Sequence, residues 1–131
     1  MRATLKILIT SLVALVLCAS GCGYDGPKLT VDELKAALDD PARAVHVIDV
    51  RPAALYRKGH VPGALSIPRE KLDRDRVLEL TRKGEVAVYC TCGWNALPAV
   101  KRLRAQGAEV ILVAGGYKKW EAAGYPTETG N

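Results

Sequence analysis

Two cysteines, Cys90 and Cys92, stand where the sequence passes from an apolar run into an expected helix. The run over residues 86–90 predicts a buried strand that ends at Cys90. The helix that follows begins at about residue 96, and its N-terminus offers unpaired N–H groups and the positive end of a dipole. Both features favour a thiolate over a thiol. The position predicts a nucleophilic Cys90 of lowered pKa, with a buried structural cysteine as the alternative.

Strands that are buried on both faces are expected to carry this cysteine. Residues 45–50 (VHVIDV), 86–90 (VAVYC) and 110–113 (VILV) are short, nearly continuous apolar runs. Such runs are typical of a parallel sheet whose two faces are both covered. Residues 64–67 are expected to add a short strand.

The segments around these strands carry helical patterns. Thr30 and Glu33 form a capping box that opens a helix. Apolar residues recur at helical spacing over residues 96–103, with Asn95 as the expected N-cap. A short last helix is expected over residues 117–123. The alternation predicts an α/β domain with a central, mainly parallel sheet and helices on both faces.

The N-terminal segment has the order of a secretory signal. Arg2 and Lys6 precede an apolar run over residues 7–17, and small residues then lead to Cys22. The sequence Ala19-Ser20-Gly21-Cys22 resembles the lipobox of bacterial lipoproteins, although that family prefers Leu at the position of Ala19. In that family the Cys sulfur receives a diacylglyceryl group and becomes the new N-terminus.

We therefore expect residues 1–21 to be a signal peptide of the lipoprotein type and residues 22–28 to be a tether. The protein would then be exported and lipid-anchored through Cys22, on the periplasmic side of a bacterial membrane. Gly23 replaces the Asp that often signals inner-membrane retention, which favours the outer membrane. Plain secretion and an uncleaved anchor are the alternatives. The uncharged stretch over residues 7–23 is shorter than the roughly 20 residues of a spanning helix.

Composition and charge exclude several function classes. Apolar residues make up 49% of the 131-residue chain and charged residues 25%, which is typical of one globular domain. The formal charge of +5 becomes smaller once the leader is removed, and so mild a surplus does not indicate nucleic-acid binding. Four cysteines are too few and too badly spaced for a disulfide framework or a zinc site. We expect no metal and no cofactor.

Residues 29–128 resemble a single-domain rhodanese, a member of the sulfurtransferase family, and residues 129–131 form a tail. Four segments carry the resemblance in the family's order: LTVDELKAAL, VIDVRPAALYRKGHVPGALSIP, VAVYCTCGWNA and LVAGGYKKWEAAGYP. Within them the family's signature residues are Asp49, Arg51, Gly59, His60, Pro62, Gly63, Ala64, Gly115, Gly116, Trp120, Ala123, Gly124 and Pro126.

The resemblance implies a site and a reaction. Cys90 would take a sulfane sulfur from a small-molecule or protein donor, hold it as a persulfide, and give it to a thiol or similar acceptor. The backbone of the following residues would cradle the sulfur: Thr91, Cys92, Gly93, Trp94, Asn95 and Ala96. Arg51 would contact the substrate, or form a structural ion pair with Asp49. His46 and His60 are expected to be structural.

The loop departs from the pattern Cys-Arg-x-Gly-x-Arg-Ser of many rhodaneses. Thr91 and Asn95 replace its two arginines, which disfavours thiosulfate as donor and favours a persulfide or polysulfide. Arg51, Arg57 and Lys58 could replace part of the charge. Two other functions stay open: a catalytically weak sulfur carrier or partner-binding module, and a thiol-redox or copper-handling protein that uses Cys90 and Cys92.

Overall fold

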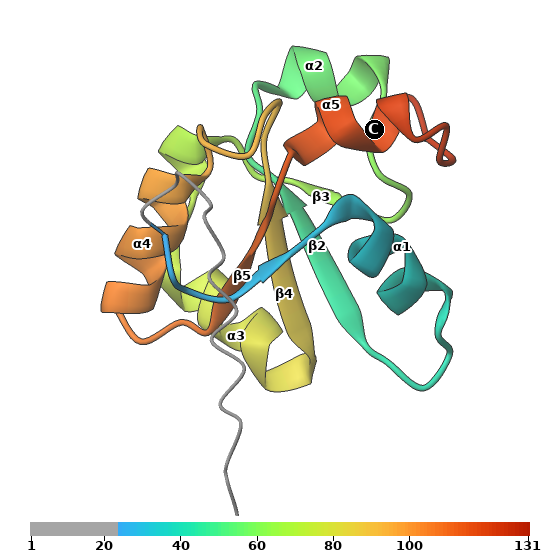
Figure 1. The fold of residues 1–131 in the computed structure, drawn as a ribbon. Coiled ribbons are helices and arrows are strands. Elements are labelled where there is room, and N and C mark those ends of the chain that lie inside the picture. The colour runs from blue at the N-terminus through green and yellow to red at the C-terminus, as the bar shows by residue number, and fades with distance from the viewer. Residues whose placement is uncertain (1–23) are drawn as a thin grey trace, which may run out of the picture.

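A five-stranded parallel sheet forms the centre of the domain in the computed structural model, which describes residues 24–131 (Figure 1). The strands run in the order β1-β5-β4-β2-β3. Their bounds are β1 Lys28–Leu29, β2 Val45–Asp49, β3 Leu65–Ser66, β4 Glu85–Tyr89 and β5 Val110–Val113. Every neighbouring pair is parallel, and β2 pairs with β4 along its whole length, from Val45↔Glu85 to Asp49↔Tyr89. The predicted parallel sheet is confirmed.

Helices cover both faces of this sheet, as the sequence predicts. Their bounds are α1 Val31–Asp39, α2 Ala53–Lys58, α3 Arg74–Lys83, α4 Leu97–Ala105 and α5 Gly116–Ala122, with a 3₁₀ turn η1 at Arg69–Lys71. Helices α3 and α4 cover one face, and α1 covers the other (Figure 1). Successive residues of each strand point to opposite faces, so two cores form.

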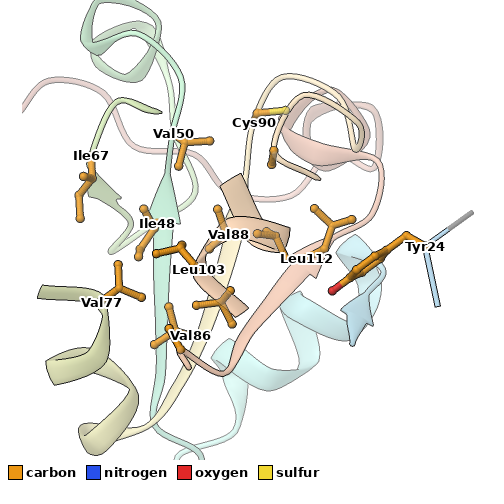
Figure 2. Close-up of a cluster of buried hydrophobic side chains, with 14 residues drawn as sticks. Tyr24, Ile48, Val50, Ile67, Val77, Val86, Val88, Cys90, Leu103 and Leu112 are labelled. Atoms are coloured by element: carbon orange, nitrogen blue, oxygen red, sulfur yellow. The ribbon is translucent and has the colours of Figure 1, made fainter. Parts of the chain in front are cut away.

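The two cores divide the apolar residues of the strands between them. Ile48 and Val88 pack beneath α3 and α4 in the core that Figure 2 shows. Val47 and Ala87, one residue earlier in each strand, pack against the core of α1, α2 and α5. This alternation explains why β2 and β4 are nearly continuous apolar runs in the sequence.

Helix α1 begins as its capping box predicts. The Thr30 hydroxyl accepts from the backbone N–H of Glu33 at 3.1 Å, and the Glu33 carboxylate accepts from the Thr30 N–H at 3.0 Å. Helices α2 and α3 were not predicted from the sequence. In α3 only Val77 is fully buried, and Leu78 and Leu80 are the other apolar residues of this ten-residue helix, so few apolar positions mark it in the sequence, although Asp73 caps it.

The segment predicted as a tether, residues 22–28, packs against the domain where the structure describes it. Tyr24 is buried beside Leu112, and Lys28 already belongs to β1. The Pro27 carbonyl accepts from the Leu112 N–H at 3.1 Å. The predicted signal peptide and the predicted lipidation site at Cys22 lie outside the described residues. Within residues 24–131, no helix is long and apolar enough to cross a membrane.

Candidate active site

The predicted nucleophile follows the last residue of β4, at the carboxyl edge of the parallel sheet. Residues 90–96 form the loop between β4 and α4, and Figure 2 shows Cys90 at the end of the core beyond Val88. Ligands of open α/β sheets bind outside this edge, because the loops that leave parallel strands gather there. The fold therefore places Cys90 and the predicted cradle where such sheets hold their sites.

Two glycines at the start of α5 hold the cysteine loop. The N–H of Tyr117 donates to the Cys90 carbonyl at 2.8 Å, and the N–H of Lys118 donates to the Thr91 carbonyl at 3.0 Å. A Cβ on Gly116 would lie 2.4 Å from the Cys90 carbonyl oxygen, and both Gly115 and Gly116 have positive φ. The loop can lie this close to α5 because Gly116 has no side chain, whereas a Cβ on Gly115 would meet the Lys119 side chain of α5.

The Cys90 thiol is buried, with 3% of the residue exposed. Burial raises the pKa of the Cys90 thiol, and backbone hydrogen bonds from Cys92, Ala96 and Asn95 act in the opposite direction without overcoming it. The prediction of a lowered pKa is therefore wrong for the free thiol. The loop N–H groups do face the sulfur, but the sulfur lies deeper in the core than the sequence could indicate.

Helix α4 begins one residue later than expected, with Ala96 and not Asn95 at the N-cap position. Ala96 has helical backbone angles and makes no side-chain cap, so the N-cap prediction for Asn95 is wrong. Residues 93–96 form turns before the helix, and the N–H of Leu97 donates to the Trp94 carbonyl at 3.2 Å. The Asn95 side chain is left exposed.

Arg51 is buried in a structural ion pair. Its Nη2 lies 2.6 Å from the Asp49 carboxylate and donates to the Gly59 carbonyl at 2.7 Å. The Asp49 carboxylate also accepts from the Tyr89 hydroxyl at 2.6 Å, and the guanidinium lies 4.1 Å from the centre of the Tyr117 ring. This geometry supports the structural reading, and the predicted substrate contact of Arg51 gains no support from it.

The other loop residues divide into buried and exposed positions. Gly93 and Ala96 are buried, Cys92 is half-buried, and Thr91 is exposed. Trp94 is 51% exposed, so it lies on the rim of the loop and does not enclose the Cys90 sulfur. Both thiols are free, and residues 24–131 contain no group of three or more His, Cys, Asp or Glu side chains that could hold a metal ion.

A groove of about 840 Å³ lies on the Cys92 side of the loop. Cys92 and Trp94 line it from the loop, and β1, β5 and α5 complete it. Cys90 is not among the lining residues. The loop therefore presents its two cysteines differently, with Cys90 in the core and Cys92 at a groove.

One cation at the loop, Arg69, was not predicted from the sequence. Arg69, in η1, donates through its guanidinium to the Asn95 carbonyl and so reaches the outer edge of the loop. No local motif marks Arg69, because the contact depends on how η1 packs beside α4. His60 is buried and stacks on Tyr56 with ring centres 3.6 Å apart, which agrees with its predicted structural role.

The chain belongs to the rhodanese-like domain family, whose sequence pattern matches residues 30–123. The solution NMR structure of the rhodanese-like domain from the Anabaena Alr3790 protein superposes with a TM-score of 0.69. The two are 34% identical over 79% of each chain. The α/β fold predicted from the resemblance is confirmed.

Curated relatives differ in the functions that their names give. The chain is 37% identical over 91 residues to the HTH-type transcriptional regulator Rv0324 of Mycobacterium tuberculosis, covering 68% of this chain and 40% of that protein. It is 28% identical over 95 residues to the putative sulfur carrier protein YrkF of Bacillus subtilis, covering 72% of this chain and 50% of that protein. The chain thus spans half or less of the length of these two relatives.

Proposed function

We propose that the protein is a sulfurtransferase that moves sulfane sulfur through a persulfide on Cys90. The observation that carries the proposal is the placement of the Cys90 sulfur directly after β4, at the carboxyl edge of the parallel sheet and at the start of the loop that leads to α4. Similarity to a relative named as a putative sulfur carrier supports it. The donor is a compound or protein with sulfane sulfur, and the acceptor is a thiol.

The proposed reaction has two displacement steps. The Cys90 thiolate attacks the sulfane sulfur of the donor, a new S–S bond forms, and the donor's own bond breaks with its electron pair leaving on the donor fragment. An acceptor thiolate then attacks the terminal sulfur, and Cys90 leaves as a thiolate. The loop N–H groups would stabilise the negative sulfur in both steps, which matters because burial disfavours that charge.

The proposal is tested by measuring the mass of the reduced chain after exposure to several sulfane-sulfur donors. Addition of one sulfur atom, located on Cys90 by peptide fragmentation, is the expected result. Catalytic release to cyanide or a thiol would then distinguish an enzyme from a carrier that loads sulfur without turnover. If no donor adds sulfur to Cys90, the proposed function is wrong.

Substitution of Asn95 by Arg should increase the use of thiosulfate. The loop carries no arginine, and an Arg fork makes charge-assisted hydrogen bonds to an oxyanion. We expect kcat/KM for thiosulfate to rise about tenfold, which corresponds to about 1.4 kcal/mol, and the rate with a small persulfide to change much less. Since Asn95 makes no N-cap, the substitution should cost no capping energy.

The matched control for this prediction is Ala105→Arg, which adds the same charge at the exposed far end of α4. Steady-state kinetics with both donors on all three proteins decides the outcome. An equal gain in both variants would mean that net charge, and not the position of the arginine in the loop, selects the donor.

We also propose that the chain is exported and anchored by lipid on Cys22, with a preference for the outer membrane. The support is the order of charge, apolar run and small residues before Cys22. Labelled fatty acid should enter the wild-type chain and not Cys22→Ser, while Cys18→Ser, four residues earlier, should still be labelled. Equal labelling of wild type and Cys22→Ser would contradict the anchor.

A further inference from the structure

Cys90 is buried, whereas Cys92 lines a groove, and the proposed reaction at Cys90 gives Cys92 no role. Cys90 is 3% exposed and does not line the groove, so a bulky thiol acceptor seated in the groove does not contact its sulfur directly. Cys92 is half-buried and lines the groove of about 840 Å³. Ligand sites in proteins are commonly about 300–1,000 Å³, so the groove has room for a molecule the size of a short peptide.

The two cysteines lie two residues apart in the same loop. The Cys90 thiol donates a hydrogen bond to the carbonyl oxygen of Cys92, and only the Cα and Cβ atoms separate that carbonyl carbon from the Cys92 sulfur. The charge of Cys92 also contributes, after burial, to the raised pKa of the Cys90 thiol. Rotation of the Cys92 side chain can therefore bring its sulfur towards a sulfur atom carried on Cys90.

The charges along the groove favour an anionic ligand. Lys28, Lys118 and Lys119 line it, and Glu33 is its acidic residue. Among residues 24–131, none of these three ammonium groups has a carboxylate ion-pair partner. Trp94 adds an exposed apolar surface beside Cys92. An acceptor with carboxylates and some apolar surface would complement this lining.

We propose that Cys92 is a second sulfur-carrying residue, which takes sulfur from Cys90 and passes it in the groove to an anionic thiol of about peptide size. This inference rests on the proposed persulfide at Cys90. The Cys92 thiolate attacks the terminal sulfur of that persulfide, a new S–S bond forms on Cys92, and Cys90 leaves as a thiolate. The acceptor thiolate then attacks the same terminal sulfur, and Cys92 leaves as a thiolate. Neither step needs an oxidant or a reductant.

The test uses the full chain, which is purified in mild detergent and reduced. It measures which cysteine carries an added sulfur atom. The chain is loaded with a limiting amount of inorganic polysulfide, its sulfurs are alkylated, and fragmentation of the loop peptide assigns the added sulfur to Cys90 or Cys92. In the wild type we expect sulfur on both residues. In Cys92→Ser and Cys92→Ala we expect sulfur to accumulate on Cys90, since the step that removes it is missing, and thermal melts check that both variants fold.

Acceptors of different size and charge complete the test. Discharge to glutathione, used as an anionic peptide thiol, should fall at least about tenfold in both Cys92 variants, and discharge to cyanide should fall far less. Lys118→Glu should slow discharge to glutathione by roughly threefold relative to cationic cysteamine. Its control is Lys101→Glu, an exposed position of α4 away from the groove.

Failure of the relay can be told apart from failure of the proposed function. If Cys90 stays unloaded in every variant, the proposed function is wrong and the relay is wrong with it. If Cys90 loads but the Cys92 variants discharge to glutathione at the wild-type rate, only the relay is overturned. Loading of Cys92 at the wild-type rate in Cys90→Ser would also overturn the relay. So would a wild-type chain that releases its added sulfur as sulfide and forms a Cys90–Cys92 disulfide.

Discussion

Cys90→Ser should abolish sulfur loading of the loop, so that transfer from any sulfane donor falls to the rate without protein. The hydroxyl of serine is not ionised near neutral pH and cannot form a persulfide, so neither proposed step has a nucleophile. The measurement is peptide-level mass spectrometry after loading, together with the rate of sulfur release to cyanide. This is the largest functional effect that we expect from any single substitution.

The fold should survive this change. Serine differs little in volume from cysteine, so the loss in stability should stay below about 1.5 kcal/mol. Thermal melts of wild type and variant check this, and Thr91→Ser is the matched control, because it changes an exposed neighbour in the same loop. If the loop of Cys90→Ser still gains sulfur at the wild-type rate, a residue other than Cys90 carries the sulfur.

Asp49→Asn should be the most destabilising single substitution in the structural frame of the site. The Asp49 carboxylate is fully buried and accepts from the Arg51 guanidinium, the Arg51 N–H and the Tyr89 hydroxyl. Removal of its charge leaves the Arg51 guanidinium buried without a counter-ion. Breaking a buried pair in this way costs about 3–5 kcal/mol.

Chemical denaturation, followed by fluorescence of the buried Trp120, measures this loss. The control is Glu85→Gln, which removes a carboxylate that pairs with Arg43 at the exposed start of β4 and should cost much less. Equal losses in the two variants would mean that the Asp49–Arg51 pair does not stabilise the frame. A sulfur-loading assay on the folded fraction of Asp49→Asn then shows whether the frame also positions the loop.

The fold was largely predictable from the sequence because local patterns carry most of its information. The apolar runs at residues 45–50, 86–90 and 110–113 locate the three central strands, although β2 and β4 end one residue earlier than the runs. The capping box at Thr30 locates the start of α1. Helix α3 was not predicted because polar residues dominate it, and its three apolar residues, Val77, Leu78 and Leu80, form only a short apolar patch.

The candidate site was predictable in position but not in its chemistry. A strand end followed by a helix start is a feature of the local sequence, and it locates Cys90 and its loop. The pKa of Cys90 is not local, because it depends on how far the packed cores remove the sulfur from water. The same holds for the N-cap, since turns over residues 93–96 lead into the helix and leave the Asn95 side chain exposed.

The sequence by itself determined the central strands β2, β4 and β5, the helices α1, α4 and α5, the family resemblance and the place of the nucleophile, since each depends on residue types at short spacing. The tertiary structure alone decided the roles of residues that meet across the chain. Packing buries Arg51 against Asp49, brings Arg69 to the loop and forms the groove at Cys92 from β1, β5 and α5. The Arg69 contact and the groove join segments far apart in sequence, whereas Asp49 and Arg51 are close in sequence and only their burial depends on how the sheet and its helices pack together.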